Sequence, residues 1–207
     1  MREVETQVAV LGAGPAGIAA ARGLAAAGLE VTLIDAGLPP APRVESLPAS
    51  GLALAEGLGL ADAVAAAILG RAQEMRMHWR SAPERRDFGA EPPLLLDRAA
   101  LHRALGDAVP DLRRITARGR LLAPKGDRQR LQAGNCTLSA RIVLDARGRA
   151  AQRSRAGLVA LAFEGTQADP AFASMRIEAL EVGWLWTAVL PGGRISGQLF
   201  LPAVALV

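Results

Sequence analysis

The feature that most constrains this chain is a glycine-rich segment between two apolar runs near its beginning. Residues 8–11 form an unbroken apolar run with the length of a buried parallel strand, and Gly12, Gly14 and Gly17 follow at the G-x-G-x-x-G spacing. Gly12 permits a tight turn, Gly14 lets the backbone approach a pyrophosphate, and Gly17 lets the next helix pack on the strand. A second apolar run ends in Asp35, whose carboxylate can accept hydrogen bonds from both hydroxyls of an adenosine ribose. This order of elements predicts a βαβ unit that binds a dinucleotide.

The predicted phosphate site is the loop and the first turn of its helix, because free amide groups and the helix dipole attract anions there. An acid at position 35 favours an unphosphorylated ribose, as in FAD or NAD, over NADP. The alternative is a glycine-containing turn in an α/β protein that binds nothing. The loop residues predicted to contact the cofactor are Gly12, Ala13, Gly14, Pro15, Ala16 and Gly17.

Composition excludes several classes of protein and site. Hydrophobic residues make up 51% of the 207 residues and charged residues 21%, values typical of a globular chain. No apolar run reaches about 18 residues, and no leader precedes the first strand, so we expect a cytoplasmic protein without a membrane span. Cys136 is the sole cysteine, which excludes an internal disulfide and a multi-cysteine metal site, and no metal site is predicted. With 3% aromatic residues and no tyrosine, the net charge of +4 does not predict nucleic-acid binding.

A change in the hydrophobic pattern divides the chain into two predicted domains. Residues 1–71 and 91–154 are expected to form a discontinuous nucleotide-binding domain with a parallel sheet and a β-meander. Residues 72–90 and 155–207 are expected to form part of an antiparallel-sheet substrate domain. The predicted fold class is therefore α/β, with a Rossmann-like cofactor-binding domain and part of a second domain.

Local patterns predict the individual elements. Ser46 is expected as the N-cap of a helix over residues 47–58, and residues 60–69 as a further short helix. Residues 73–80 alternate as a strand with Glu74 on its wet face. Asp97 is expected to cap a helix that ends near residue 108. Further strands are expected at residues 94–96, in a meander over 118–144, and at residues 158–164, 174–182, 184–190 and 195–201.

Four segments together resemble the flavoprotein monooxygenases of the p-hydroxybenzoate hydroxylase type. They are the glycine unit that ends at Asp35, the Arg-Val-Glu-Ser-Leu-Pro stretch at 43–48, the Leu-Asp-Arg-Ala-Ala-Leu stretch at 96–101, and the strand end at 140–149. The sequence is most similar to the tryptophan-halogenase-like branch, which includes maturation flavoproteins of quinone-cofactor enzymes. Arg147 stands where that family usually has Thr. The resemblance covers only the N-terminal half of a typical member.

The resemblance implies FAD as the cofactor and adds candidate contacts to the loop residues. Arg43 and Arg98 are the implied partners of the pyrophosphate, since guanidinium groups bind such oxygens in a bidentate way. Glu45 either hydrogen-bonds the isoalloxazine or ribose side of FAD or neutralises Arg43. Asp145 either meets the cofactor or caps the next turn, and Ser46 belongs to the same implied set. The family has a glycine directly before this glutamate, which is absent here.

The activity that the resemblance implies is that of an FAD-dependent oxidoreductase. It would be a monooxygenase that hydroxylates an electron-rich, aromatic or protein-borne substrate through a flavin hydroperoxide, with NADH or NADPH as a transient reductant. The protein would supply binding, orientation and exclusion of water. No titratable residue stands in a recognisable catalytic motif, so no catalytic residue is assigned.

Other readings of the sequence stay open. A flavin-dependent reductase or dehydrogenase and a non-catalytic nucleotide-binding fragment are both compatible with the glycine motif. Trp184 and Trp186 resemble the start of the halogenase Trp-x-Trp-x-Ile-Pro signature, with packing on one strand face as the alternative. The sole lysine, Lys125, lies in a predicted turn and matches no halogenase lysine, so halogenation ranks below oxygenation. The apolar run at 199–207 and the lack of a later Gly-Asp flavin motif predict a truncated chain that pairs with a missing C-terminal half.

Overall fold

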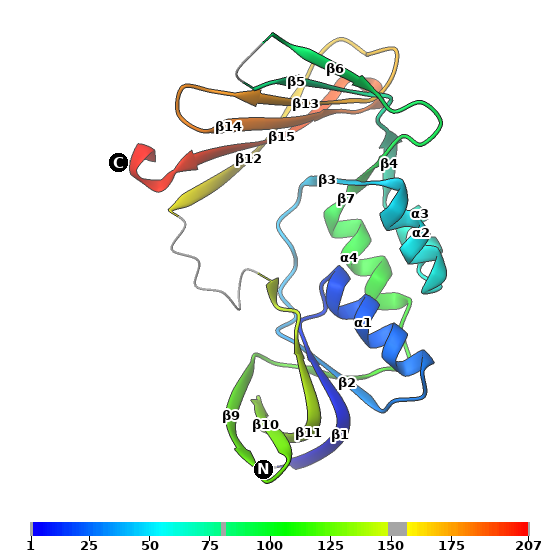
Figure 1. The fold of residues 1–207 in the computed structure, drawn as a ribbon, viewed down its shortest axis with the longest axis vertical. Coiled ribbons are helices and arrows are strands. Elements are labelled where there is room, and N and C mark those ends of the chain that lie inside the picture. The colour runs from blue at the N-terminus through cyan, green and yellow to red at the C-terminus, as the bar shows by residue number, and fades with distance from the viewer. Residues whose placement is uncertain (1, 80–81, 149–156, 207) are drawn as a thin grey trace. The chain divides into compact units, whose positions relative to one another are not determined.

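The computed structural model describes residues 2–79, 82–148 and 157–206 (Figure 1). The chain divides into two compact units, and each unit is assembled from separate stretches of sequence. The first comprises Met1–Pro40, Leu58–Ala63 and His102–Arg153, and the second comprises Ala41–Gly57, Val64–Leu101 and Ser154–Val207. No helix in the described ranges is long and apolar enough to span a membrane.

The first unit contains a six-stranded sheet with the strand order β8-β2-β1-β11-β10-β9. Its strands are β1 (Arg2–Leu11), β2 (Val31–Asp35), β8 (Arg113–Thr116), β9 (Gly119–Lys125), β10 (Arg128–Ala133) and β11 (Cys136–Asp145). β1 runs parallel to both β2 and β11, β2 runs parallel to β8, and β9, β10 and β11 form an antiparallel meander. Helix α1 (Pro15–Ala26) connects β1 to β2. The βαβ unit and the meander are both those that the sequence predicts.

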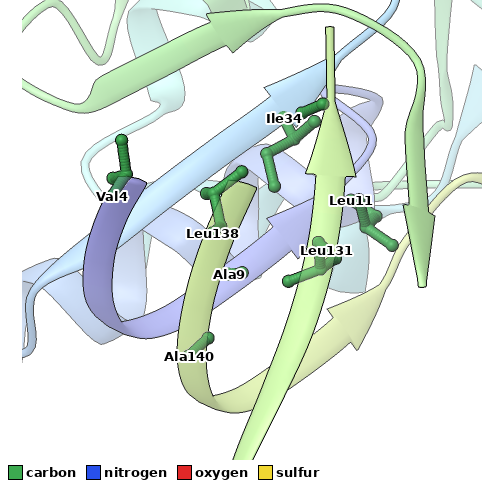
Figure 2. Close-up of a cluster of buried hydrophobic side chains, with 8 residues drawn as sticks. Val4, Ala9, Leu11, Ile34, Leu131, Leu138 and Ala140 are labelled. Atoms are coloured by element: carbon green, nitrogen blue, oxygen red, sulfur yellow. The ribbon is translucent and has the colours of Figure 1, made fainter. Parts of the chain in front are cut away.

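The core of this unit fixes the position of β1. Residues 8–11 of that strand are each at most 2% exposed, as a strand that is covered on both faces requires. Side chains from β1, β2, β10 and β11 meet in one cluster, which Figure 2 shows. The cluster comprises Val4, Ala9, Leu11, Ile34, Leu131, Ala133, Leu138 and Ala140. This packing holds β1 between β2 and β11, and with it the loop that follows β1.

The second unit contains two sheets. The smaller has the order β3-β7-β4 and is antiparallel, and the larger has the order β12-β15-β14-β13-β5-β6. Neighbours in the larger sheet are antiparallel except β5 and β13, which are parallel. The strands are β3 (Val44–Leu47), β4 (Ile68–Arg71), β5 (Glu74–His78), β6 (Glu84–Asp87), β7 (Leu94–Asp97), β12 (Leu158–Thr166), β13 (Ser174–Ala179), β14 (Trp184–Val189) and β15 (Arg194–Pro202).

The remaining helices are short. They are α2 (Ala49–Gly57), α3 (Ala61–Ala65) and α4 (Arg98–Asp107), with 3-10 turns at Pro191–Gly193 and Ala203–Leu206. The start of α4 is set by Asp97, whose Oδ1 accepts hydrogen bonds from the amides of Ala99 at 2.7 Å and Ala100 at 2.9 Å. This contact is the predicted N-cap, which satisfies amides that have no partner within the helix.

The predicted α/β fold class is confirmed, but two predicted helix boundaries are wrong. Ser46 does not cap a helix, because it pairs with Leu95 inside β3, and α2 begins only at Ala49. Residues 60–69 are not one helix, since α3 ends at Ala65 and β4 pairs with β7. In both cases pairing with β7, a fully apolar strand apart from its last residue, decides the local conformation over the helical pattern.

The predicted strand at 73–80 is present as β5, but the expectation for Glu74 is wrong. Glu74 is buried, with 1% of its surface exposed. The Glu74 carboxylate pairs with Arg76 on the same strand at 2.7 Å and with Arg85 at 2.6 Å. Arg85 lies on β6, which the sequence pattern does not predict, as it does not predict β8. The acid is covered because a neighbouring charged strand supplies its partner.

The two units do not have the same bounds as the two predicted domains. Residues 41–57, 64–71 and 91–101 were expected in the nucleotide-binding domain and belong to the second unit. The reason is local: β3, β4 and β7 pair with one another in the small sheet. The residues of the glycine loop and Asp35 therefore belong to the first unit, and those of the predicted arginine contacts to the second.

Candidate functional site

The glycine loop between β1 and α1 is packed closely on one side. Gly12 has φ +101°, and a Cβ at this position would lie 2.7 Å from the carbonyl oxygen of Ala146. A Cβ at Gly17 would overlap the carbonyl oxygen of Gly12. The Gly12 amide donates to the Ile34 oxygen at 2.7 Å, which ties the loop to the end of β2. The first and third glycines are thus required by backbone conformation and by packing within the protein.

Gly14 differs from Gly12 and Gly17 because nothing in the described part of the chain requires a glycine there. No heavy atom lies within 4 Å of the Cβ that a substitution would add, among the residues that the structure describes. Gly14 is the N-cap of α1 with φ −69° and ψ 175°, which any residue adopts, and no side chain caps the helix there. Among residues 2–79, 82–148 and 157–206, the helix N-terminus therefore faces open space with its first amides free, the arrangement that attracts a phosphate group.

Asp35 is held against the same loop. Its Oδ2 accepts a hydrogen bond from the Ala13 amide at 2.9 Å, and its Oδ1 accepts one from the Gly37 amide at 2.7 Å. These two bonds orient the carboxylate but leave acceptor capacity on each oxygen, because an ionised carboxylate has about four lone-pair sites. The acid and the loop can therefore act on one ligand: amides toward its phosphates and carboxylate oxygens toward its hydroxyls.

Asp145 ends β11 and forms a tight ion pair with Arg147. Its Oδ1 accepts from the Arg147 amide at 3.2 Å and from Nε at 2.9 Å, and its Oδ2 accepts from Nη2 at 2.6 Å. The hydrogen bond from the Arg147 side chain holds the pKa of Asp145 below its usual range, and outweighs the opposing effect of burial. Arg147 also donates to the Gly119 oxygen at 3.1 Å. This geometry shows Asp145 as the cap of the turn, and its contact with the cofactor stays a prediction.

The structure thus gives Arg147 a partner that sequence reasoning missed. The sequence shows only that an arginine replaces the usual Thr of the family at this position. The Asp-x-Arg spacing, with a glycine at position 148 directly after, is a local signal from which the pair could have been found. The neighbouring Arg149, which completes the fourth family segment, lies outside the described residues.

A second group of predicted residues meets in the small sheet of the second unit. Glu45 on β3 accepts two hydrogen bonds on Oε1 from Arg43, from Nε at 2.8 Å and from Nη2 at 2.6 Å. Its Oε2 accepts one from Nη1 of Arg98 at 2.8 Å. The three side chains are 19–29% exposed. Burial would raise the pKa of Glu45, but the hydrogen bonds from Arg43 and Arg98 prevail and lower it.

Arg98 has unused donor capacity. Its Nε is buried and has no hydrogen-bond partner among the described residues. A buried donor without a partner costs free energy, and it is satisfied when a ligand oxygen reaches it. Ser46 alternates to the other side of β3 from Glu45 and is exposed, so the structure does not bring it into this group.

The tryptophan pair on β14 packs on its neighbours. Trp184 stacks on Phe200 with ring centroids 3.7 Å apart, and meets the edge of Trp79 at 6.3 Å. Trp186 packs against the hydrophobic cluster of the second unit. Both observations agree with the packing alternative for the Trp-x-Trp sequence.

Two comparisons with known sequences match parts of this chain. Residues 6–89 match the family described as pyridine nucleotide-disulphide oxidoreductases. A stretch of 47 residues is 51% identical to hydroxyneurosporene desaturase of Rhodobacter capsulatus, and covers 23% of this chain and 10% of that protein.

Solved structures of a dihydroxylase, an FAD-dependent halogenase and a monooxygenase match nearly the whole chain. The peptidyl tryptophan dihydroxylase essential for tryptophylquinone cofactor biogenesis is 32% identical with a TM-score of 0.72, over 99% of this chain and 47% of that one. The myxobacterial chondrochloren halogenase is 21% identical with a TM-score of 0.76, over 98% and 54%. The p-nitrophenol 4-monooxygenase of Pseudomonas putida is 17% identical with a TM-score of 0.70, over 97% and 58%. At these identities the last two show the fold alone.

The predicted resemblance is confirmed by these neighbours: the dihydroxylase supports it in sequence, and the halogenase and the p-nitrophenol monooxygenase share the fold. The chain spans about half the length of each of them. Within the first unit, two observations fit the adenosine diphosphate part of FAD. Among the described residues the N-terminus of α1 faces open space at Gly14, and Asp35 is hydrogen-bonded to the loop at the Ala13 amide. Within the second unit, Arg98 Nε is buried without a partner among the described residues, which leaves it available to an anion.

Proposed function

We propose that this chain is the FAD-binding part of a flavin-dependent monooxygenase that hydroxylates an electron-rich aromatic group, either free or carried by a protein. The observation that carries the proposal is the unobstructed amide cradle at Gly14 with Asp35 hydrogen-bonded to it. This chain is also 32% identical to a peptidyl tryptophan dihydroxylase, in a match that covers 99% of this chain. That neighbour acts on a peptidyl tryptophan, an aromatic group carried by a protein, and this supports a substrate of the same class here.

In this proposal the residues of the chain bind and orient the cofactor. Gly14 and the first amides of α1 receive the diphosphate, and Asp35 accepts hydrogen bonds from the adenosine ribose. Arg43 and Arg98 add cationic donors for the diphosphate oxygens. Bound FAD would supply the redox chemistry, with two electrons from NADH or NADPH, one oxygen atom of O₂ inserted into the substrate and the other reduced to water. Exclusion of water from the reacting groups would require the part of such enzymes that this chain does not span.

A reductase or dehydrogenase is the second candidate, and a specific observation favours it. The local 51% identity over 47 residues is to a desaturase, which acts by removing hydrogen from its substrate. That match covers 10% of the desaturase, whereas the dihydroxylase match extends over 47% of its chain. The longer match supports the monooxygenase.

The test begins with cofactor binding by the purified chain. We expect FAD to bind, ADP to compete with it, and riboflavin not to compete, because the cradle receives the adenosine diphosphate end. Uptake of ADP without FAD would favour the non-catalytic nucleotide-binding fragment, and uptake of neither would refute the cofactor assignment. NADH and NADPH oxidation is then measured with and without indole-containing peptides. Product that carries one oxygen atom from ¹⁸O₂ supports the monooxygenase, and dehydrogenated product without ¹⁸O supports the dehydrogenase.

A further inference from the structure

Glu45 lies between two arginines and uses both of its oxygens on them. We propose that Glu45 is a positioning residue, which holds Arg43 and Arg98 in place to receive one diphosphate group together and makes no contact with the cofactor itself. The inference rests on the proposed function, because FAD is the source of that diphosphate.

The backbone explains why these three side chains meet. In the pairing of β3 with β7, Val44 lies opposite Asp97, and the Arg98 amide donates to the Arg43 oxygen at 3.0 Å, which extends the ladder by one residue. Arg43 and Arg98 are therefore cross-strand neighbours. Glu45 is two residues from Arg43 and shares its face of the strand. Two like charges opposite each other repel, so an acid on the same face is needed to hold them together.

The hydrogen bonds show which group has capacity left for a ligand. Glu45 accepts three donors and, as a carboxylate, has no hydrogen to offer to a phosphate oxygen. Each guanidinium has five N–H groups, of which Arg43 spends two on Glu45 and Arg98 spends one. The three side chains together carry a net positive charge, which suits an anion. The arginines are therefore the groups that can bind the ligand, and Glu45 acts through them.

For the change in FAD affinity on Glu45→Gln, this role predicts the opposite sign to the one that electrostatics alone predicts. Glu45→Gln removes a negative charge near the proposed diphosphate, so the field alone would tighten binding. If Glu45 positions the arginines, the neutral amide holds at most one of them well, because its NH₂ group cannot accept from the other. We expect Glu45→Gln to weaken FAD binding about tenfold, the size of one lost charge-assisted hydrogen bond.

The experiment compares dissociation constants of FAD and of inorganic pyrophosphate for the whole chain and four variants. The variants are Glu45→Gln, the double variant Arg43→Met with Arg98→Met, the triple variant, and Glu178→Gln. Glu178 is the matched control, since it pairs with an arginine at 2.7 Å in the same unit and is 26% exposed. Urea unfolding of every variant separates a loss of binding from a loss of folding. We expect weaker binding in Glu45→Gln, no change in Glu178→Gln, and no further loss when Glu45→Gln is added to the double variant.

The outcomes distinguish this inference from the proposed function. FAD binding that is unchanged or tighter in Glu45→Gln overturns the positioning role and leaves the cofactor assignment intact. The positioning role is also overturned if Glu45→Gln weakens binding further in the double variant that lacks both arginines. In that case Glu45 would contact the ligand directly. Binding of pyrophosphate without FAD, with the same pattern among the variants, supports the arginine site and refutes the FAD assignment. A wild-type chain that binds neither ligand overturns both.

Discussion

Replacing Gly14 and Gly17 separately by alanine distinguishes a glycine kept for a ligand from one kept for packing. A Cβ at Gly17 would overlap the Gly12 carbonyl oxygen and lie 3.3 Å from the Ala146 Cβ. Overpacking of this kind costs about 1–3 kcal/mol, of which a better helix propensity returns about 0.5–1 kcal/mol. We therefore expect Gly17→Ala to lower the free energy of unfolding by about 1–2 kcal/mol. The FAD affinity of Gly17→Ala would fall only if the added methyl group displaces the glycine loop.

Gly14→Ala should leave the stability nearly unchanged and weaken FAD binding, the reverse of Gly17→Ala. Its Cβ meets nothing within 4 Å among the described residues, and φ −69° is unstrained for alanine. The lost preference for glycine at an N-cap and the lower entropy of the unfolded chain nearly cancel, so the free energy of unfolding should change by less than about 1 kcal/mol. The added methyl group occupies the space that a diphosphate would need. Loss of one or two charge-assisted hydrogen bonds weakens FAD binding by about ten- to a hundredfold.

The assay is urea unfolding of both variants together with FAD titration by flavin fluorescence. Gly57→Ala serves as a control, because its Cβ also meets nothing within 4 Å among the described residues and it lies at the end of α2. Stable Gly14→Ala protein that binds FAD like the wild type would refute the placement of the diphosphate. Equal destabilisation of the Gly14 and Gly17 variants would refute the packing argument.

Three further predictions concern stability. Asp97→Ala should lower the free energy of unfolding by about 1 kcal/mol in urea titration, since two amides at the start of α4 lose their acceptor. Glu74→Gln should lower it by about 2 kcal/mol, because two charge-assisted contacts to a buried acid are lost while the exposed arginines return to water. Glu45 and Asp145 have lowered pKa values, so the stability they contribute is complete above the ordinary carboxyl range and is lost as the pH falls through their lowered pKa values. The urea midpoint should therefore fall between about pH 5 and pH 3, and fall less steeply in Glu45→Gln. A midpoint that rises on acidification would contradict this sign.

The parts of the fold that the sequence predicts well are those decided within a few residues. The strand at 31–35 ends at Asp35 because a buried apolar run meets a polar residue and a glycine, and no distant partner is needed to see it. The N-cap at Asp97 depends on amides two and three residues later. The turn of the β-meander at Gly134 is set by its positive φ of 59°. Each of these signals is local in the chain.

The parts that it does not predict depend on partners far away in sequence. Ser46 follows the pattern of a helix start, but its backbone pairs with Leu95 on β7. Glu74 occupies a position that alternation assigns to solvent, and it is buried because Arg85 approaches from a strand with no apolar residue. The contact between Glu45 and Arg98 has the same origin, since the register of β3 on β7 brings them together. Such pairings cannot be deduced from one sequence by periodicity.

The parallel pairing of β1 with β11 also has a consequence for the order of folding. Leu11 at the end of β1 pairs with Asp145 at the end of β11, whereas the strands of the meander pair with their neighbours in sequence. Contacts across so long a loop carry a large closure entropy and form late. The turn at Gly12 lies against Ala146, so a growing chain that has made the whole glycine motif still lacks the wall of its nucleotide site. Nucleotide binding would thus appear only after β11 has docked, and FAD fluorescence would report the completion of folding in this unit.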